Sequence, residues 1–228
     1  MSNVASIQLR EITTSHNPRP PVPFLQAALA EEGYEGYKVI DLVHELALSD
    51  DPANKAKFVA LIEKYEGQAV PDSLVALADS RVKREIQAIL LRSFRVKAGD
   101  AYVTHYGVVV GERRFIAAAY NHAKHGLPAE IKAEVQDGAR LNKDQAFDLA
   151  VDENAKRRGV SDYEHGVIFK EYRGRVNPAT GKNYSLKEIG EKFGFDYQFV
   201  RGRHALAAYL PEADQRRLAA GGRVNITA

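Results

Sequence analysis

The stretch VVVGERRFIAAAYNHAKHG, from Val108 to Gly126, is the most informative part of the sequence. Its three β-branched valines predict the end of a buried strand, Gly111 turns the chain, and helix-forming residues follow from Phe115 to Lys124. The first N–H groups of a helix lack partners within it, and the helix dipole places partial positive charge there. Arg113 and Arg114 add forked donors that fit phosphate oxygens. The stretch therefore predicts a phosphate-binding turn; the alternative is an ordinary strand-to-helix junction with solvated arginines.

The composition of the 228-residue chain is that of a globular protein, with 45% hydrophobic and 27% charged residues. It contains no cysteine, which excludes disulfides and thiolate metal sites and favours a cytoplasmic location. No apolar run approaches the ~20 residues of a membrane-spanning helix, and the first residues lack the pattern of a secretory signal. We therefore expect a cytoplasmic protein without membrane contact.

Charge is distributed unevenly along the chain. The part from Lys156 to Arg217 holds thirteen Lys or Arg residues and eight Asp or Glu residues, so it carries +5. The remainder carries −3, which gives the net charge of +2. A basic C-terminal part joined to a mildly acidic N-terminal part predicts that the C-terminal part contacts a polyanion.

The hydrophobic pattern predicts an α+β protein in which strands and helices come first and helices alone follow. Strands are expected at Val4 to Ile12, Ala88 to Val96, Ala101 to Val110 and Ile131 to Val135. Helices are expected within Phe24 to Gly67 and at Asp72 to Ser80, Phe115 to Lys124, Lys143 to Arg158, Asp162 to Tyr172 and Ser185 to Leu206.

The last of these segments has the spacing of a helix-turn-helix. Ser185 and Glu188 form a capping box at the start of the first helix. Gly190 is small where the two helices would cross, Gly194 begins the turn, and Val200 on the second helix faces back toward the first. The local basic charge favours DNA binding, and the alternative is a helical hairpin without a DNA role. The second helix is expected to begin near Tyr197 and to expose Gln198, Arg201 and Arg203.

In this order, the motifs resemble the ParB family of chromosome and plasmid partition proteins, with its KorB and Noc relatives. The segments that carry the resemblance are NPR at 17–19, GERRFIAA at 111–118, LPAEI at 127–131, ENAKR at 153–157, the helix-turn-helix, and LPEADQRRLAAGGRVN at 210–225. The resemblance implies a ParB-like, sulfiredoxin-like mixed sheet with helices at 1–140, an inserted helical lobe at about 21–71, and an all-α helix-turn-helix domain at 141–228.

Members of this family bind CTP with Mg²⁺ in the N-terminal domain and read a palindromic, centromere-like DNA site. Specific DNA promotes closure of a dimeric clamp that slides along the duplex, and slow CTP hydrolysis resets it. The resemblance therefore implies a nucleotide-switched homodimeric clamp with CTPase activity in plasmid or chromosome partition. It also implies association with the nucleoid or a plasmid and a ParA-type ATPase partner.

The resemblance also assigns roles to individual residues. Phosphate contacts fall to Gly111, Arg113, Arg114 and Arg157, and a role in hydrolysis falls to Glu112. Glu153 and Asn154 are expected to lie beside the triphosphate and the metal. The backbone from Gln87 to Arg92 is expected to recognise the cytosine. The DNA contacts are assigned to Ser185, Lys187, Tyr197, Gln198, Arg201 and Arg203.

Three features depart from the family pattern. The segment from Pro20 to Pro71 is longer than the usual link and is expected to bind a partner or to modify clamp closure. The loop from Gly174 to Tyr184 is long and basic and is expected to touch the DNA backbone. The sequence ends at Ala228 without the family's C-terminal dimerisation domain, so we expect either a truncated chain or another mode of dimerisation.

Other functions compete with the partition clamp. A KorB-like transcriptional repressor on the same fold would need no nucleotide turnover. A ParB-like nuclease is disfavoured because no run of clustered Asp, Glu and His offers a two-metal site. An enzyme related to sulfiredoxin is disfavoured because that chemistry uses a reactive cysteine, and the chain has none.

Overall fold

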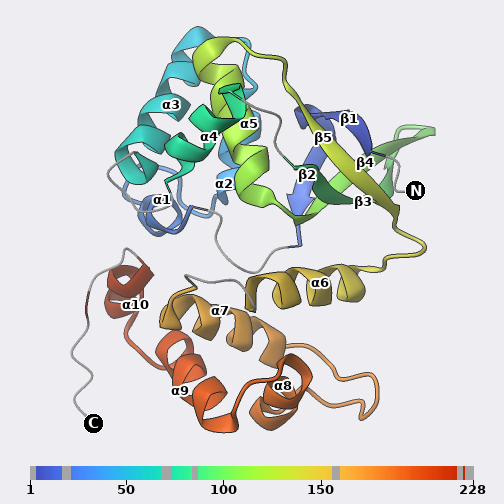
Figure 1. The fold of residues 1–228 in the computed structure, drawn as a ribbon, viewed down its shortest axis with the longest axis vertical. Coiled ribbons are helices and arrows are strands. Elements are labelled where there is room, and N and C mark those ends of the chain that lie inside the picture. Colours follow the sequence, from blue (N-terminus) through green and yellow to red (C-terminus); the bar gives the residue numbers. More distant parts are fainter. Residues whose placement is uncertain are drawn as a thin grey trace.

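The computed structural model describes residues 4–16, 22–67, 73–83, 87–155, 160–219 and 223. A five-stranded mixed sheet with helices forms the N-terminal half, and a mostly helical region follows (Figure 1). This arrangement confirms the α+β class. The NPR segment at 17–19 lies outside the described residues.

The sheet has the strand order β1-β5-β3-β4-β2. Its strands are β1 (Val4–Gln8), β2 (Ile12–Ser15), β3 (Ile89–Ala98), β4 (Ala101–Val110) and β5 (Glu130–Asp137). Strands β3 and β4 form an antiparallel hairpin, β1 runs antiparallel to β5, and β5 and β2 run parallel to β3 and β4 respectively. Strands β3 and β4 confirm the two strands expected at Ala88 to Val96 and Ala101 to Val110.

The predicted strand from Val4 to Ile12 was wrong as a single element. A 3₁₀ turn, η1 (Leu9–Glu11), ends β1 at Gln8, and β2, which begins at Ile12, lies at the opposite edge of the sheet. Leu9 and Ile12 are both fully buried although they are three residues apart, a spacing that a continuous strand cannot place on one face. The turn resolves this conflict by letting both side chains enter the core.

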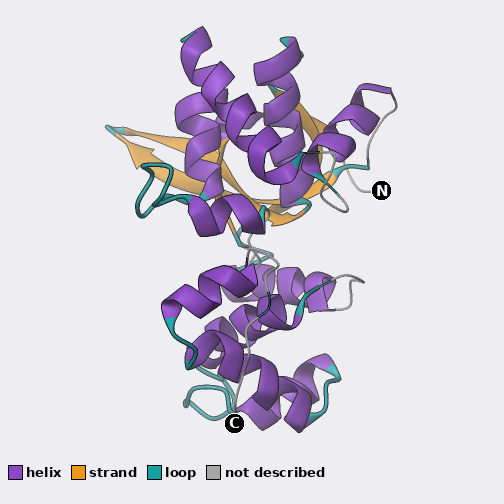
Figure 2. Ribbon diagram, turned by 90° about the vertical axis from the view of Figure 1, so that its left-hand side faces the viewer, coloured by secondary structure: helices purple, strands orange, loops and turns teal. Residues whose placement is uncertain are grey.

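Helices of the N-terminal half gather on one face of the sheet (Figure 2). They are α1 (Pro23–Ala28), α2 (Val39–Leu42) with the π-helical turn η2 (Val43–Ala47), α3 (Pro52–Glu66), α4 (Leu74–Lys83) and α5 (Glu112–His125). Asp51 caps α3 by accepting a hydrogen bond from the Ala53 N–H, and Pro52 occupies its first turn. One continuous hydrophobic core joins these helices to the sheet.

A second core forms in the C-terminal region from α6 (Lys143–Ala155), α7 (Asp162–Arg173), α8 (Leu186–Phe193) and α9 (Tyr197–Ala208), and α10 (Glu212–Ala219) follows. Helix α6 contributes to two clusters: Ala146 packs with Val109 of β4, whereas Phe147 and Val151 enter the second core. It therefore connects the sheet to the helical region. Within the described ranges, no helix is both long and apolar enough to span a bilayer.

Candidate functional site

The GERR turn, residues 111–114, joins β4 to α5 as the sequence predicted. Gly111 is the N-cap of α5 and has φ = 98°, a left-handed conformation that favours glycine. A Cβ on this residue would lie 2.6 Å from Cγ2 of Ile89, so a side chain there would also meet the neighbouring strand. The N-terminal end of α5 points toward the helical region (Figure 1). The backbone thus forms the strand, glycine and helix arrangement that can receive an anion.

Arg113 is directed into the protein rather than outward from the turn. Its Nη1 and Nη2 atoms both lie 3.3 Å from Oε2 of Glu66, the last residue of α3. Glu66 is 1% exposed and the Arg113 side chain is 19% exposed, so the ion pair is largely shielded from water. Sequence reasoning missed Glu66, which lies 47 residues from its partner and carries no local signal of the pairing.

Arg114 is also engaged within the domain. Its Nη1 donates to the backbone carbonyls of Gln87 at 3.0 Å and Ala88 at 2.8 Å, just before β3 begins. Arg81 of α4 donates in turn to the carbonyls of Arg114 and Glu130, and burial lowers the pKa of its guanidinium. These contacts tie α4, α5 and the start of β3 together.

The segment assigned to the cytosine lies mostly in the middle of the sheet. From Ile89 onward its backbone pairs with both β4 and β5. The Arg92 side chain is buried, and it donates to the carbonyls of Leu141 and Gly138. Only the Gln87 and Ala88 carbonyls precede the strand, and Arg114 already binds both of them.

The acidic residues assigned to hydrolysis and metal binding come from two helices. Glu112 is buried in the first turn of α5, and Glu153 is partly exposed near the end of α6. The Asn154 side chain and all of Arg157 lie outside the described residues. Over the described ranges, no group of three or more His, Cys, Asp and Glu residues is arranged to hold a metal ion. Mg²⁺ often takes only one or two protein carboxylates, so Glu153 is compatible with that role.

The backbone of the GERR turn is therefore suited to bind a phosphate group, whereas its arginine side chains already have partners within the domain. Gly111 and the helix N-terminus have the required conformation. The two guanidinium groups are held by Glu66 and by the Gln87 and Ala88 carbonyls, so a phosphate would have to compete for them.

A groove elsewhere in the N-terminal half has the wrong charge for a triphosphate. It is lined by Thr13, Gly36, Tyr37, His44 and three carboxylates: Glu35, Asp41 and Glu45. The Tyr37 hydroxyl donates to Glu45 at 2.6 Å. No predicted site residue lines this groove.

Helices α8 and α9 have the geometry that the sequence predicted. The Ser185 hydroxyl accepts from the Glu188 N–H at 3.2 Å, and the Glu188 carboxylate accepts from the Ser185 N–H at 2.7 Å. Gly194 ends α8 with φ = 76°, and α9 begins at Tyr197. A Cβ on Gly190 would lie 2.7 Å from the Phe195 carbonyl oxygen, so only glycine permits this close approach.

The residues assigned to DNA fall into two groups. Tyr197, Gln198 and Arg201 are exposed on the first two turns of α9, and Lys187 is exposed on α8 beside Glu191. Ser185 is used as a helix cap, and Arg203 is ion-paired with Asp162 of α7. Sequence reasoning missed Asp196, which caps α9 by accepting from the Gln198 and Phe199 N–H groups. An Asp immediately before a helical pattern is the signal that could have identified it.

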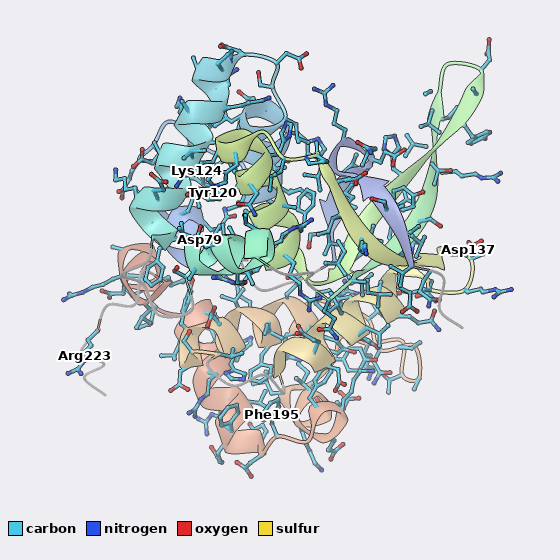
Figure 3. The ribbon with its side chains drawn as sticks, turned by 45° about the horizontal axis from the view of Figure 1, so that its top comes forward. Asp79, Tyr120, Lys124, Asp137, Phe195 and Arg223 are labelled. Carbon is cyan, nitrogen blue, oxygen red and sulfur yellow. The ribbon has the colours of Figure 1, made fainter. Side chains whose placement is uncertain are left out.

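Aromatic packing fixes the turn between α8 and α9. Phe195 in the turn stacks on Phe199 with ring centroids 4.9 Å apart, and both contact His165 of α7. Figure 3 shows Phe195 within the helical region. The turn is therefore anchored to α7 and not only to its two flanking helices.

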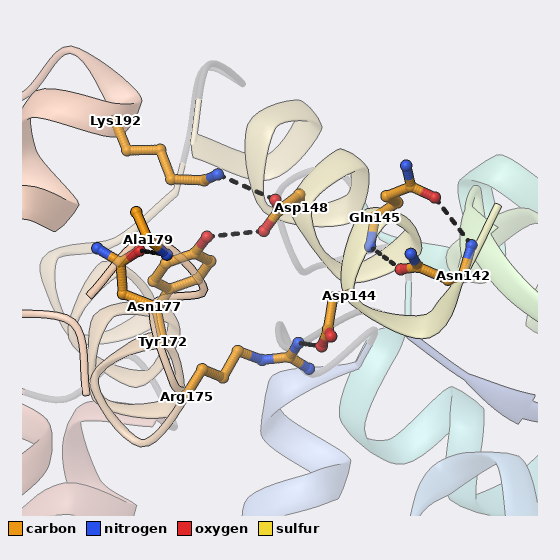
Figure 4. A network of polar contacts seen from close by, with 9 residues as sticks. All are labelled: Asn142, Asp144, Gln145, Asp148, Tyr172, Arg175, Asn177, Ala179 and Lys192. Carbon is orange, nitrogen blue, oxygen red and sulfur yellow. Dashed lines mark hydrogen bonds and ion pairs between the residues drawn. The ribbon is translucent and has the colours of Figure 1, made fainter. Parts of the chain in front are cut away.

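A polar network connects α6 to α7 and α8 (Figure 4). The Tyr172 hydroxyl donates to Asp148 at 2.8 Å, and Lys192 contacts the other oxygen of Asp148 at 3.0 Å. Arg175 pairs with Asp144 at 2.7 Å and lies 3.5 Å above the Phe147 ring. Burial and the Asp148 carboxylate both raise the pKa of Tyr172, which keeps its hydroxyl protonated as a donor. Helix α6 is thus fixed to the helices that precede and form the turn.

Comparison with known proteins gives no family for this chain. No protein-family model matches the sequence, and no curated protein matches it. The resemblance to ParB proteins therefore depends on the motifs themselves.

Proposed function

We propose that this chain is a ParB-like DNA-binding protein in which α8 and α9 form a helix-turn-helix that reads duplex DNA. The main support is the close approach at Gly190 together with the exposed Tyr197, Gln198 and Arg201 at the start of α9. In helix-turn-helix proteins, the first residues of the second helix reach base edges in the major groove. Lys187, which is exposed on α8, would contact phosphates beside that groove.

We further propose that the GERR turn binds CTP, with Mg²⁺ held in part by Glu153. The conformation of Gly111 at the N-terminus of α5 supports an anion there. The metal would neutralise phosphate charge and supply Lewis acidity for slow hydrolysis. The clamp, its homodimer, the ParA-type partner and the role in plasmid or chromosome partition follow from the resemblance alone.

A KorB-like repressor without nucleotide turnover is the second candidate. The observation that favours it is the engagement of both guanidinium groups inside the domain, Arg113 by Glu66 and Arg114 by backbone carbonyls. Such a protein would use the same helix-turn-helix and would leave the GERR turn as a structural junction.

Selection of duplexes from a random pool tests the DNA-binding proposal. The proposal predicts enrichment of one inverted-repeat sequence, because a homodimer presents two copies of α9. Arg201→Ala should reduce the enrichment, while the salt-sensitive binding to random duplex is largely retained. A pool that remains random after repeated selection would contradict the proposal.

A further inference from the structure

We infer that Glu66 is an internal counter-ion that occupies Arg113 in place of a phosphate, so that nucleotide binding at the GERR turn exchanges one anion for another. The inference rests on the proposed nucleotide site and identifies a residue that controls its occupancy. It also assigns a role to the lobe at about 21–71, because α3 (Pro52–Glu66) belongs to that segment.

The geometry of the pair supports this inference. Both terminal nitrogens of Arg113 lie 3.3 Å from one oxygen of Glu66, so a single anionic oxygen accepts from the whole fork. Phosphate oxygens are bound by arginine through the same donors. The N–H groups that face Glu66 cannot serve a phosphate at the same time, so Glu66 and a phosphate compete for them.

Arg113 compensates an otherwise unfavourable feature of the position of Glu66. It is the last residue of a 15-residue helix, where a negative charge opposes the helix dipole. It is also 1% exposed, and an ionised carboxylate at that depth requires a compensating cation. Arg113 provides such a cation, so the ion pair stabilises a carboxylate at this end of α3.

Glu63 offers an internal comparison on the same helix. It is exposed, and it accepts from Lys124 at 2.6 Å and from the Tyr120 hydroxyl at 2.8 Å. Tyr120 and Lys124 lie together on α5 (Figure 3). Glu63 therefore links the same two helices as Glu66 does, through a contact that does not involve the GERR turn.

Release of Glu66 has a structural consequence. A phosphate that took the fork of Arg113 would remove this cation from the buried Glu66 carboxylate, which is unfavourable. Loss of this ion pair would favour a movement of the end of α3 that brings Glu66 closer to water. Nucleotide at the GERR turn would thus act on the lobe at about 21–71 through one residue.

The test is calorimetric titration of CTP with Mg²⁺ into four proteins: wild type, Glu66→Gln, Glu63→Gln and Arg113→Gln. We expect Glu66→Gln to bind at least about tenfold more tightly than wild type, because a charge-assisted contact no longer has to be broken. Glu63→Gln should bind like wild type, and Arg113→Gln should lose binding. CTP should also raise the melting temperature of Glu66→Gln more than that of wild type.

The outcomes separate the inference from the proposed site. Equal or weaker binding by Glu66→Gln, with wild type binding, would overturn the inference and leave the nucleotide site standing. No binding by wild type and tight binding by Glu66→Gln would support both. No binding by either protein would overturn both.

If Glu66→Gln does not fold, hydrogen exchange on the wild-type protein gives the answer. CTP should accelerate exchange in the last turn of α3, and unchanged or slower exchange in a protein that binds CTP would overturn the inference.

Discussion

Arg203 of α9 forms an ion pair with Asp162 of α7, with Nη2 and Oδ1 3.0 Å apart. Its guanidinium also lies 4.0 Å above the Phe199 ring. Arg201, two residues earlier on the same helix, is exposed. We therefore expect Arg201 to contact DNA and Arg203 to stabilise helix packing, although both are arginines and lie only two residues apart.

Replacing these arginines one at a time separates DNA contact from helix packing. Arg201→Ala should weaken specific duplex binding by about 1–3 kcal/mol and leave the melting temperature unchanged. Arg203→Ala should lower stability by about 1 kcal/mol or less, because its pair is partly exposed, and should retain most DNA affinity. Fluorescence anisotropy and thermal melting measure the two effects. Loss of DNA binding by Arg203→Ala with an unchanged melting temperature would mean that Arg203 contacts DNA directly.

The loop from Gly174 to Tyr184, which precedes α8, exposes a lysine. Val176 and Asn183 form a β-bridge, and the Asn177 side chain donates to Glu188 of α8 at 2.9 Å. Lys182, beside this bridge, is exposed. Lys182→Gln should reduce the slope of log affinity against log salt by about 1, equally for specific and random duplexes. Lys97→Gln, an exposed lysine on the β3–β4 hairpin, is the matched control and should leave the slope unchanged. An identical slope for Lys182→Gln and wild type would show that the loop does not touch phosphates.

Two glycines in the α8–α9 region provide a paired test of packing. A Cβ on Gly190 would meet a backbone oxygen at 2.7 Å, whereas a Cβ on Gly202 would have nothing within 4 Å. Gly190→Ala should destabilise the fold by about 1–3 kcal/mol, because the backbone must move apart. Gly202→Ala should stabilise it by about 0.5–1 kcal/mol, because glycine is unfavourable within a helix. Urea unfolding measures both, and equal effects of the two changes would refute the close approach of α8 to the turn at Phe195.

Local signals in the sequence were sufficient for the elements that carry the candidate sites. Three valines, a glycine and a run of helix formers predicted the β4–α5 junction, and the spacing from Ser185 to Val200 predicted α8 and α9. Each of these depends on caps, turns and periodicity within a few residues. The break in the first strand was missed because it depends on burial of Leu9 and Ile12 in the assembled core.

Side-chain partners were not predictable in the same way. Glu66 lies 47 residues from Arg113, and Asp162 lies 41 residues from Arg203. Neither ion pair is encoded in a short motif, because each forms only when two helices pack against each other. Sequence motifs therefore placed the arginines on the correct elements and could not tell where their guanidinium groups point.

His16 should make the protein sensitive to acid. Burial, with Arg92, Lys143 and Arg175 nearby, lowers its pKa from 6.5 to about 4. Between pH 6.5 and pH 4, His16 binds a proton in the unfolded chain and not in the folded protein. The free energy of unfolding therefore falls as the pH decreases through this range. Below pH 4, His16 causes no further loss of stability. We expect His16→Gln to reduce the loss of stability over this range by on the order of 2 kcal/mol. Urea unfolding at pH 7.5 and pH 4.5 measures the difference, and equal losses in both proteins would contradict the assignment.

The central claim is that a cytidine nucleotide at the GERR turn controls DNA binding by α8 and α9. Its most direct test is the affinity and dissociation rate of the protein for its selected duplex, measured with Mg²⁺ and each of CTP, ATP, GTP and UTP. The account predicts a change of at least about tenfold with CTP, a coupling of about 1.4 kcal/mol, and no change with the other three nucleotides. If affinity and dissociation rate are the same without nucleotide and with each of the four nucleotides, the central claim is contradicted and the KorB-like repressor is favoured.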